Sequence, residues 1–509
     1  MVRPASPRMP TVVSCPGKVL VAGGYLVLDR QHQGFVSATP SRFYTVIQNA
    51  GEPGAGVERF SITVVSPQFV DGRWEYEARK EADEWVVDAL GREESSGNTF
   101  VHLSVQAALQ VASALNPSAT LGSLEVTIVG SNDFYSQSRS DSAPVPFSPL
   151  NCTIRNVHKT GLGSSAAMVT SLTSSLLLHW TSSPSSSTSA SHGRLPNPDD
   201  EIIHLLHNLA QYVHSLAQGK VGSGFDVSAA VYGSQTYRRF AVECLGDLLD
   251  PQAKGGSKIA SKDLLSILSP TLNPAWTAPS TAGAVTSFSL PPHTLLLLAD
   301  VDAGSNTPSM VGKVMQWKKA APKEAERVWS ELGRSNEALR NVFAELSEAA
   351  KKDTSGYERE VARLAGLSAK EWSSSTVPFA AAAQRILNIR ALMRYMGEQS
   401  GVPIEPPEQT KLLDACSALP GVIGAGVPGA GGYDAIWVLC LDPPSESASN
   451  PPASAVESLL FSYTNMSVRP LSQSAWVRGG TFEGEAGLLR ERVEEIVGLK
   501  EAIERGRKR

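Results

Sequence analysis

KTGLGSSAAMVTSL, residues 159–172, is the most informative stretch of this chain, because a glycine-rich turn passes directly into helix-forming, largely apolar sequence. Gly161 and Gly163 lack a Cβ atom and can adopt turn conformations that place successive N–H groups around an anion. A helix that begins near Ser164 adds the positive end of its dipole. The stretch favours a phosphate-binding loop, and these residues alone leave open a tight turn before an N-capped core helix.

The length and composition of the chain indicate a globular enzyme with two domains. Its 509 residues exceed the size at which a single hydrophobic core stops growing. Hydrophobic residues make up 42% and charged residues 19% of the chain, and the net charge is −5, which argues against a nucleic-acid-binding protein. A mildly acidic protein binds anionic substrates only through a local cluster of cations and backbone N–H groups.

The cysteines and the N-terminal residues bear on the cellular compartment. The apolar stretch near the N-terminus is interrupted by Pro16 and Lys18, which argues against a secretory signal. No segment reaches the ~18 apolar residues of a membrane span, so we expect no membrane partner. Five widely spaced cysteines, an odd number, predict reduced thiols in a cytoplasmic protein: Cys15, Cys152, Cys244, Cys416 and Cys440.

The pattern of apolar residues predicts strands interleaved with helices, and hence α+β packing in both domains. In the first half we expect a hairpin over 12–28, strands over 43–48, 60–65 and 124–129, and helices over 98–115, 164–179 and 199–218. In the second half we expect strands over 294–301 and 435–441 and helices over 308–350, 377–399, 409–419 and 487–509. The serine-rich residues 181–199 and the segment 246–282 are expected to be insertions.

Two further motifs place a charged residue beside a glycine turn. Pro16-Gly17-Lys18 is followed by Gly23-Gly24, and Lys18 is either a solvated edge-strand residue or a cation aimed at a substrate. In KVGSGFD, residues 220–226, Asp226 opens an expected helix. It either stabilises the helix dipole or orients a nucleophile.

A third glycine-rich motif, residues 424–434, contains a formal G-x-G-x-x-G. Pro428 interrupts the turn, and a strand follows where a dinucleotide site needs a helix, so we reject a dinucleotide site. Close approach of this backbone to another loop or to a ligand explains the glycines better. The sequence also lacks the P-loop motif and the protein-kinase motifs, which argues against those two enzyme classes.

Taken in order, PGKVLVAGGYLVLD, KTGLGSSAAMVTSL, GSGFDVSAAVYGS and GVPGAGGYDAI resemble the motifs of the GHMP small-molecule kinases. Within that superfamily the chain is similar to the phosphomevalonate kinases of the fungal type, over most of its length apart from the insertions. The resemblance implies a two-domain α+β fold: a ribosomal protein S5 domain 2-like unit over 1–285 and a ferredoxin-like unit over 286–509. It also implies transfer of the ATP γ-phosphoryl group to phosphomevalonate.

The resemblance assigns roles to residues of this sequence. It implies that Lys18 and Asp226 are catalytic and that Ser165 meets Mg²⁺, the expected cofactor beside ATP. The nucleotide phosphates are expected to be held by Lys159, Gly161, Leu162, Gly163, Ser164, Ser165, Ala166 and Ala167. The substrate is expected to contact Lys18, Lys220, Ser223, Ser305, Gly431 and Gly432.

One departure from the family pattern concerns the metal. Mevalonate kinases carry a glutamate ligand on the helix before the catalytic acid, whereas a rough alignment puts His214 or Ser215 there. Mg²⁺ is then expected to be held mostly by ATP, a serine and water. Because two anionic groups must meet, extra cations are needed, and the candidates are Lys18, Lys159, Lys220, Arg390 and Arg394.

Other functions stay open at this point. Another GHMP kinase, acting on mevalonate, homoserine or a sugar, is the nearest alternative, and a non-catalytic ligand sensor with the same fold is a second. The presence of Lys18, Ser165 and Asp226 argues against the sensor. The expected assembly is a monomer or a homodimer.

Overall fold

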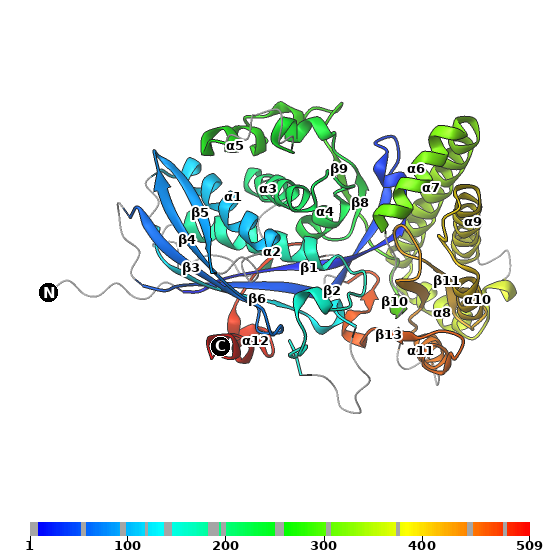
Figure 1. Ribbon diagram of the computed structural model, residues 1–509. Helices are drawn as coiled ribbons and strands as arrows, with labels where there is room; N and C mark the ends of the chain where they lie inside the picture. Colours follow the sequence, from blue (N-terminus) through cyan, green and yellow to red (C-terminus); the bar gives the residue numbers. More distant parts are fainter. Residues whose placement is uncertain are drawn as a thin grey trace.

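The structure is a computed structural model. It describes residues 9–51, 57–91, 98–117, 121–136, 145–181, 193–194, 200–249, 259–301, 307–372, 377–444, 451–481 and 486–508. Strands and helices are interleaved along the chain and form two sheet-containing units, as Figure 1 shows. The α+β packing expected from the sequence is confirmed.

Within the described residues, the first unit is built on a ten-stranded sheet in the order β5-β4-β3-β6-β2-β1-β15-β7, with β8 paired to β2 and β9 paired to β8. Its longest strands are β1 and β2, which pair antiparallel along most of their length. The strands are β1 (Thr11–Ala22), β2 (Gly34–Asn49), β3 (Arg59–Val65), β4 (Arg73–Glu81), β5 (Glu84–Leu90), β6 (Leu124–Gly130), β7 (Gly193–Arg194), β8 (Gln235–Arg238), β9 (Ala284–Ser287) and β15 (Leu489–Glu491).

Helices cover both faces of this sheet (Figure 1). On one face lie α1 (Thr99–Leu115), α2 (Ser164–Thr181), α3 (Glu201–Gln218) and α4 (Phe225–Tyr232), with α5 (Ser261–Leu268) packed against α1. The opposite face is covered by the C-terminal helix α12 (Leu499–Arg507), whose Leu499 and Ile503 pack on Tyr44 and Val46 of β2. Both ends of the chain therefore contribute to the first unit.

The second unit is built on the sheet β11-β12-β10-β13, with β14 also paired to β10. The central strand β10 is buried along its whole length, because helices cover both of its faces. Successive leucines of β10 point to opposite faces of the sheet. Leu296 and Leu298 belong to the same core as the helices α7 and α9, whereas Leu295 and Leu297 belong to the core with α10 and α11. The strands are β10 (Thr294–Val301), β11 (Val422–Gly426), β12 (Ala435–Leu441), β13 (Val468–Pro470) and β14 (Val477–Arg478). The helices are α6 (Thr307–Ala320), α7 (Pro322–Lys352), α8 (Thr354–Ala365), α9 (Val377–Ser400), α10 (Pro407–Ser417) and α11 (Pro452–Ser462).

The hairpin expected over 12–28 is wrong. Thr11–Ala22 is one strand that runs through Pro16, and Leu26–Leu28 is a short 3₁₀ helix. The register of β1 against β2 shifts between Pro16 and Lys18, and β15 pairs only with residues 12–14 of β1. Proline is tolerated in a strand at a bulge or where one side lacks a partner strand. Pro16 lies at the register shift and beyond the residues that pair with β15, so it meets both conditions.

The helix expected over 487–509 is also wrong in its first part. Leu489–Glu491 forms β15, which pairs with β1, and α12 begins only at Leu499. The segment 246–282 contains the helix α5, whose Leu264 and Leu268 are fully buried, so it is more than a surface loop. Of the serine-rich insertion, residues 182–192 and 195–199 lie outside the described residues.

The division of the chain at residues 285 and 286 stays a prediction. β9 ends the first sheet at Ser287 and β10 opens the second at Thr294, but β15 and α12 return to the first unit. All five cysteines are unpaired, as expected. Among the described residues, no helix is long and apolar enough to cross a membrane.

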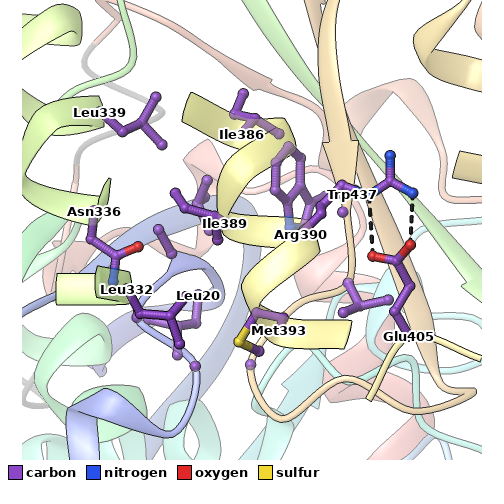
Figure 2. A pocket seen from close by; sticks show the side chains of 17 residues that line it. Leu20, Leu332, Asn336, Leu339, Ile386, Ile389, Arg390, Met393, Glu405 and Trp437 are labelled. Atoms are coloured by element: carbon purple, nitrogen blue, oxygen red, sulfur yellow. Dashed lines mark hydrogen bonds and ion pairs between the residues drawn. The ribbon is translucent and has the colours of Figure 1, made fainter. Parts of the chain in front are cut away.

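A buried ion pair joins α9 to the segment before α10. Figure 2 shows Arg390 donating two hydrogen bonds to Glu405, at 3.1 Å from Nε and 2.7 Å from Nη2. The Glu405 side chain is completely buried and also accepts from Arg394 at 2.9 Å. Burial raises the pKa of Glu405, but its hydrogen bonds to the two arginines outweigh that effect and hold the pKa below its ordinary value. The pair lines a cavity of about 30 Å³ between the end of β1, α7 and α9.

We expect Glu405→Gln to destabilise the protein by about 3 kcal/mol, because it leaves the charge of buried Arg390 largely uncompensated. The value lies at the low end for broken buried pairs because Asp414 still contacts Arg390 at 2.9 Å. The free energy of unfolding in urea measures the effect. Glu360→Gln removes the half-exposed pair with Arg363 and serves as the control. It should cost less than about 1 kcal/mol, and an equal cost for both variants would contradict the prediction.

A chain of buried hydrogen bonds connects α3 to the end of α5. Asn208 donates to the Leu268 carbonyl at 2.8 Å, and its Oδ1 lies 2.9 Å from Nδ1 of His207. Nε2 of His207 lies 3.1 Å from the amide nitrogen of Gln211. Since the amide donates there, Nε2 is the acceptor and the proton lies on Nδ1. Burial lowers the pKa of His207 to about 4, which keeps the ring neutral.

This histidine predicts a loss of stability in acid. Because its pKa lies at about 4 in the folded chain and about 6.5 in the unfolded chain, the unfolded state binds the proton first. The contribution of His207 to the free energy of unfolding is therefore complete above pH 6.5 and falls by about 3 kcal/mol as the pH drops to 4. Urea unfolding at pH 7 and pH 4 should show a smaller loss in His207→Gln than in the unmodified protein. The exposed His158→Gln is the control and should leave the acid loss unchanged.

Candidate active site

The glycine turn and the helix behind it have the geometry expected of a phosphate loop. Gly161 and Gly163 have left-handed φ angles of 77° and 78°, where a side chain would be strained. The helix α2 begins at Ser164, and no acidic residue lies in its first turn to compete with an anion for the dipole. The expected helix start is confirmed. Behind it, Leu162, Ala166 and Ala167 are buried and fix the loop to the core.

Lys18 lies directly against this loop. Its backbone N–H donates to the Leu162 carbonyl at 2.9 Å, and its Nζ donates to the Gly161 carbonyl at 2.9 Å. A Cβ atom on Gly163 would lie 3.0 Å from Cε of Lys18, so the lysine side chain lies directly on this glycine. The strand β1 is therefore hydrogen-bonded to the glycine turn through both the backbone and the side chain of Lys18.

Asp226 lies in the first turn of α4, close to Lys18. Its Oδ1 accepts from the Val227 N–H at 3.0 Å, which orients the carboxylate at the helix start. Burial lowers the pKa of Lys18 below that of an ordinary lysine, and the charge of Asp226 raises it again in part. Nζ of Lys18 also lies 5.4 Å from the centre of the Phe225 ring. The two residues that the resemblance names as catalytic thus lie together.

The hydroxyl of Ser165 lies 3.1 Å from Nε2 of His214, and Gln218 contacts the same nitrogen at 3.1 Å. Of the two residues considered in place of the family's glutamate, His214 is thus the one that contacts the serine. Ser215 is buried, and its carbonyl accepts from the Lys220 N–H at the end of α3. Within the described residues, no group of three or more His, Cys, Asp or Glu side chains is placed to hold a metal.

The glycine-rich segment before β12 packs on the end of β1. The Gly429 N–H donates to the Leu20 carbonyl at 3.3 Å, and a Cβ atom on Gly24 would lie 2.1 Å from the Gly429 carbonyl oxygen. Gly431 is equally confined, since its Cβ would lie 2.1 Å from the Ile404 carbonyl oxygen. Close backbone approach, which we expected in place of a dinucleotide site, is confirmed.

These elements enclose a cavity of about 190 Å³. It brings together four of the residues predicted from the sequence: Lys18, Gly161, Ser223 and Gly431. Sequence reasoning missed other lining residues, which carry no chemical signature of their own, including Tyr25, Phe225 and Val311. Tyr25 had one indirect signal, its position after Gly23-Gly24, and its hydroxyl donates to the Ala430 carbonyl at 2.9 Å.

The remaining predicted residues that the structure describes do not line this cavity. Lys159 and Lys220 are exposed, on the segment before the loop and at the end of α3, and Gly432 is buried against Ile404. Arg390, considered as a substrate cation, is instead buried and paired with Glu405. Ser305 lies outside the described residues, although Val311, in the helix α6 that follows, lines the cavity.

Comparisons with known proteins agree with this arrangement. The family model for the C-terminal part of GHMP kinases matches residues 379–451. A phosphomevalonate kinase of Aspergillus fumigatus is 38% identical over 86% of this chain and 88% of its own length. A peroxisomal phosphomevalonate kinase of Arabidopsis thaliana is 36% identical over 85% of this chain and 90% of its own length.

The fold is also found among solved structures. The phosphomevalonate kinase of Streptococcus pneumoniae, solved in complex with phosphomevalonate and AMPPNP, superposes with a TM-score of 0.55 at 14% identity. The superposition covers 92% of this chain and 99% of that chain. A Listeria innocua protein gives a TM-score of 0.56 at 16% identity. With the sequence relatives matched over most of both lengths, this chain belongs to the phosphomevalonate kinase family of the GHMP kinases.

Proposed function

We propose that this protein transfers the γ-phosphoryl group of ATP to (R)-5-phosphomevalonate and releases (R)-5-diphosphomevalonate and ADP, in the mevalonate route to isopentenyl diphosphate and sterols. Relatives of 33–38% identity over most of the chain support the assignment. The observation that carries it is the single cavity onto which Lys18, the Gly161 turn and Ser223 converge. Asp226 lies three residues after Ser223, in the first turn of α4.

The chain's own residues act on this reaction mainly through position and charge, which is how phosphoryl transfer is generally catalysed. The turn from Gly161 to Ala167 and the N-terminus of α2 would hold the nucleotide phosphates. Lys18 supplies a cation at the boundary between this loop and the cavity. The substrate would contact Lys18, Ser223, Gly431 and Gly432, with Lys159, Lys220 and Ser305 as further contacts.

The acceptor determines what Asp226 must do. An alcohol has to lose its proton during attack, whereas a phosphate group with a second pKa of ~6 is already largely dianionic at pH 7. Asp226 is therefore needed less as a base than as an orienting group. Its charge also favours the protonated form of Lys18, which the two anionic reactants require.

The residues near the loop offer few protein ligands that suit Mg²⁺. Mg²⁺ prefers oxygen donors and keeps several waters, and the Ser165 hydroxyl is an oxygen donor that this loop offers. The imidazole of His214 suits other metals better. We propose that Mg²⁺ is held by ATP, water and Ser165, where it would neutralise charge on the phosphates. A cytoplasmic location and a monomeric or dimeric state likewise stay proposals.

Turnover of different acceptors tests the proposed function. The kcat/KM for ADP release should be at least about 10²-fold higher with (R)-5-phosphomevalonate than with mevalonate. Mevalonate has no phosphate group, so the cations of the site would be left without a partner when it binds. Homoserine and galactose serve as further acceptors. Robust turnover of mevalonate would assign the protein to another GHMP activity. Thermal stabilisation by ATP without any turnover would indicate the non-catalytic sensor.

Asp226→Asn separates the two roles of the carboxylate. We expect kcat at pH 7 to fall by less than the ~10²- to 10⁴-fold typical of an essential general base. Removing the negative charge also lowers the pKa of Lys18 further, so the alkaline limb of the kcat profile should move to lower pH. The exposed Asp263→Asn carries the same charge change and should alter neither quantity. A larger loss of kcat with an unmoved alkaline limb would contradict this account.

A further inference from the structure

The loop that leads into α4 is held by side chains that donate hydrogen bonds to its backbone carbonyl groups. Four consecutive carbonyls, those of residues 221–224, each accept a hydrogen bond from a side chain. Most backbone carbonyls are satisfied by other backbone groups or by water, so four side-chain partners in succession are unusual. Arg239 Nη2 donates to Val221 at 3.1 Å and to Gly222 at 2.6 Å, Tyr237 Oη donates to Ser223 at 2.7 Å, and Gln211 Nε2 donates to Gly224 at 2.7 Å.

We call these three side chains, Gln211, Tyr237 and Arg239, the carbonyl clamp. They come from two elements, since Gln211 lies on α3 whereas Tyr237 lies on β8 and Arg239 directly follows it. Tyr237 and Gln211 are each 2% exposed. Residues on regular elements with buried side chains hold a site more closely than loop residues do.

The clamp residues are fixed by further contacts of their own. Tyr237 is paired with Gly34 of β2 in the first sheet. The amide of Gln211 also contacts Nε2 of His207 at 3.1 Å, and Nη1 of Arg239 donates to the Leu28 carbonyl at 3.2 Å. The loop is therefore tied to the sheet on one side and to α3 on the other.

The last carbonyl held by the clamp, that of Gly224, lies two residues before the proposed catalytic residue Asp226. Gly224 has a left-handed φ of 77°, and a Cβ atom there would lie 2.9 Å from the Gln211 amide oxygen. The Gly224 carbonyl accepts from Gln211 and also from the Ser228 N–H at 3.0 Å, which is the first hydrogen bond of α4. Gln211 thus fixes the turn that carries Asp226. Tyr237 fixes Ser223, which lines the cavity.

We propose that Gln211, Tyr237 and Arg239 are positioning residues for phosphoryl transfer, which hold Ser223 and Asp226 in register with Lys18. The proposal rests on the proposed function, because it assigns Asp226 a part in the reaction. Misplacing a reacting group by about 1 Å can cost about 10²-fold in rate. A clamp that only satisfied buried carbonyls would affect stability without a selective effect on kcat.

The test is Tyr237→Phe, which removes one donor and leaves the ring in place. Tyr76→Phe is the matched control, because Tyr76 is 1% exposed and its hydroxyl has no hydrogen-bond partner among the described residues. For the full-length protein, kcat and the KM for ATP are measured with (R)-5-phosphomevalonate. Deuterium uptake is measured in peptides that cover residues 221–228.

In Tyr237→Phe we expect kcat to fall about tenfold, the KM for ATP to change by less than about twofold, and deuterium uptake in 221–228 to become faster. Tyr76→Phe should change none of these quantities. A kcat within twofold of the unmodified protein, an unchanged uptake, or an equal effect of both variants would overturn the proposal.

If Tyr237→Phe folds poorly, Arg239→Lys replaces it, because lysine keeps the charge but lacks the planar fork of donors that reaches two carbonyls and Leu28. The same expected results and the same overturning results apply. Failure of the proposed function gives a different result, namely an unmodified protein that does not turn over phosphomevalonate. Deuterium uptake in 221–228 tests the clamp even then, because it needs no substrate.

Discussion

The contact between Lys18 and the proposed phosphate loop is the interaction on which the rest of the candidate site depends. Lys18 donates to the loop twice, from its backbone to Leu162 and from its side chain to Gly161, both at 2.9 Å. The same strand continues to Leu20, whose carbonyl accepts from Gly429 of the second unit. β1 therefore connects the first sheet, the phosphate loop and the glycine-rich segment before β12, and a shift of this strand would displace all three.

Electrostatics explains why the lysine and the aspartate are neighbours. Burial disfavours the charged form of Lys18, whereas the role proposed for Lys18 beside two anionic reactants needs the charged form. The negative charge of Asp226, whose Oδ1 accepts from the Val227 N–H, restores part of the lost basicity. The clamp on residues 221–224 completes this arrangement, since it holds the turn from which Asp226 projects.

The sequence was most reliable where a conformation depends on neighbouring residues alone. The turn at Gly161 and Gly163, the helix start at Ser164 and the strand over 294–301 were all expected and are all present. The sequence was misleading where the conformation of a segment depends on the strand with which it pairs. Pro16 suggested a turn, but a bulge and the absence of β15 beside it let β1 continue. Leu489–Glu491 looked helical, but these residues pair with the first strand of the chain.

By itself, the sequence determined the kinds of groups that the site contains: glycines able to turn around a phosphate, a lysine on a strand and an acid at a helix start. Only the tertiary structure decided that Lys18, Gly161, Ser223 and Gly431, from both halves of the chain, line one cavity. It alone also showed that Arg390 is neutralised by Glu405 and that Tyr237 holds Ser223. The reason is physical: turn and helix propensities act between chain neighbours, whereas ion pairs, burial and hydrogen bonds act between groups that only folding brings together.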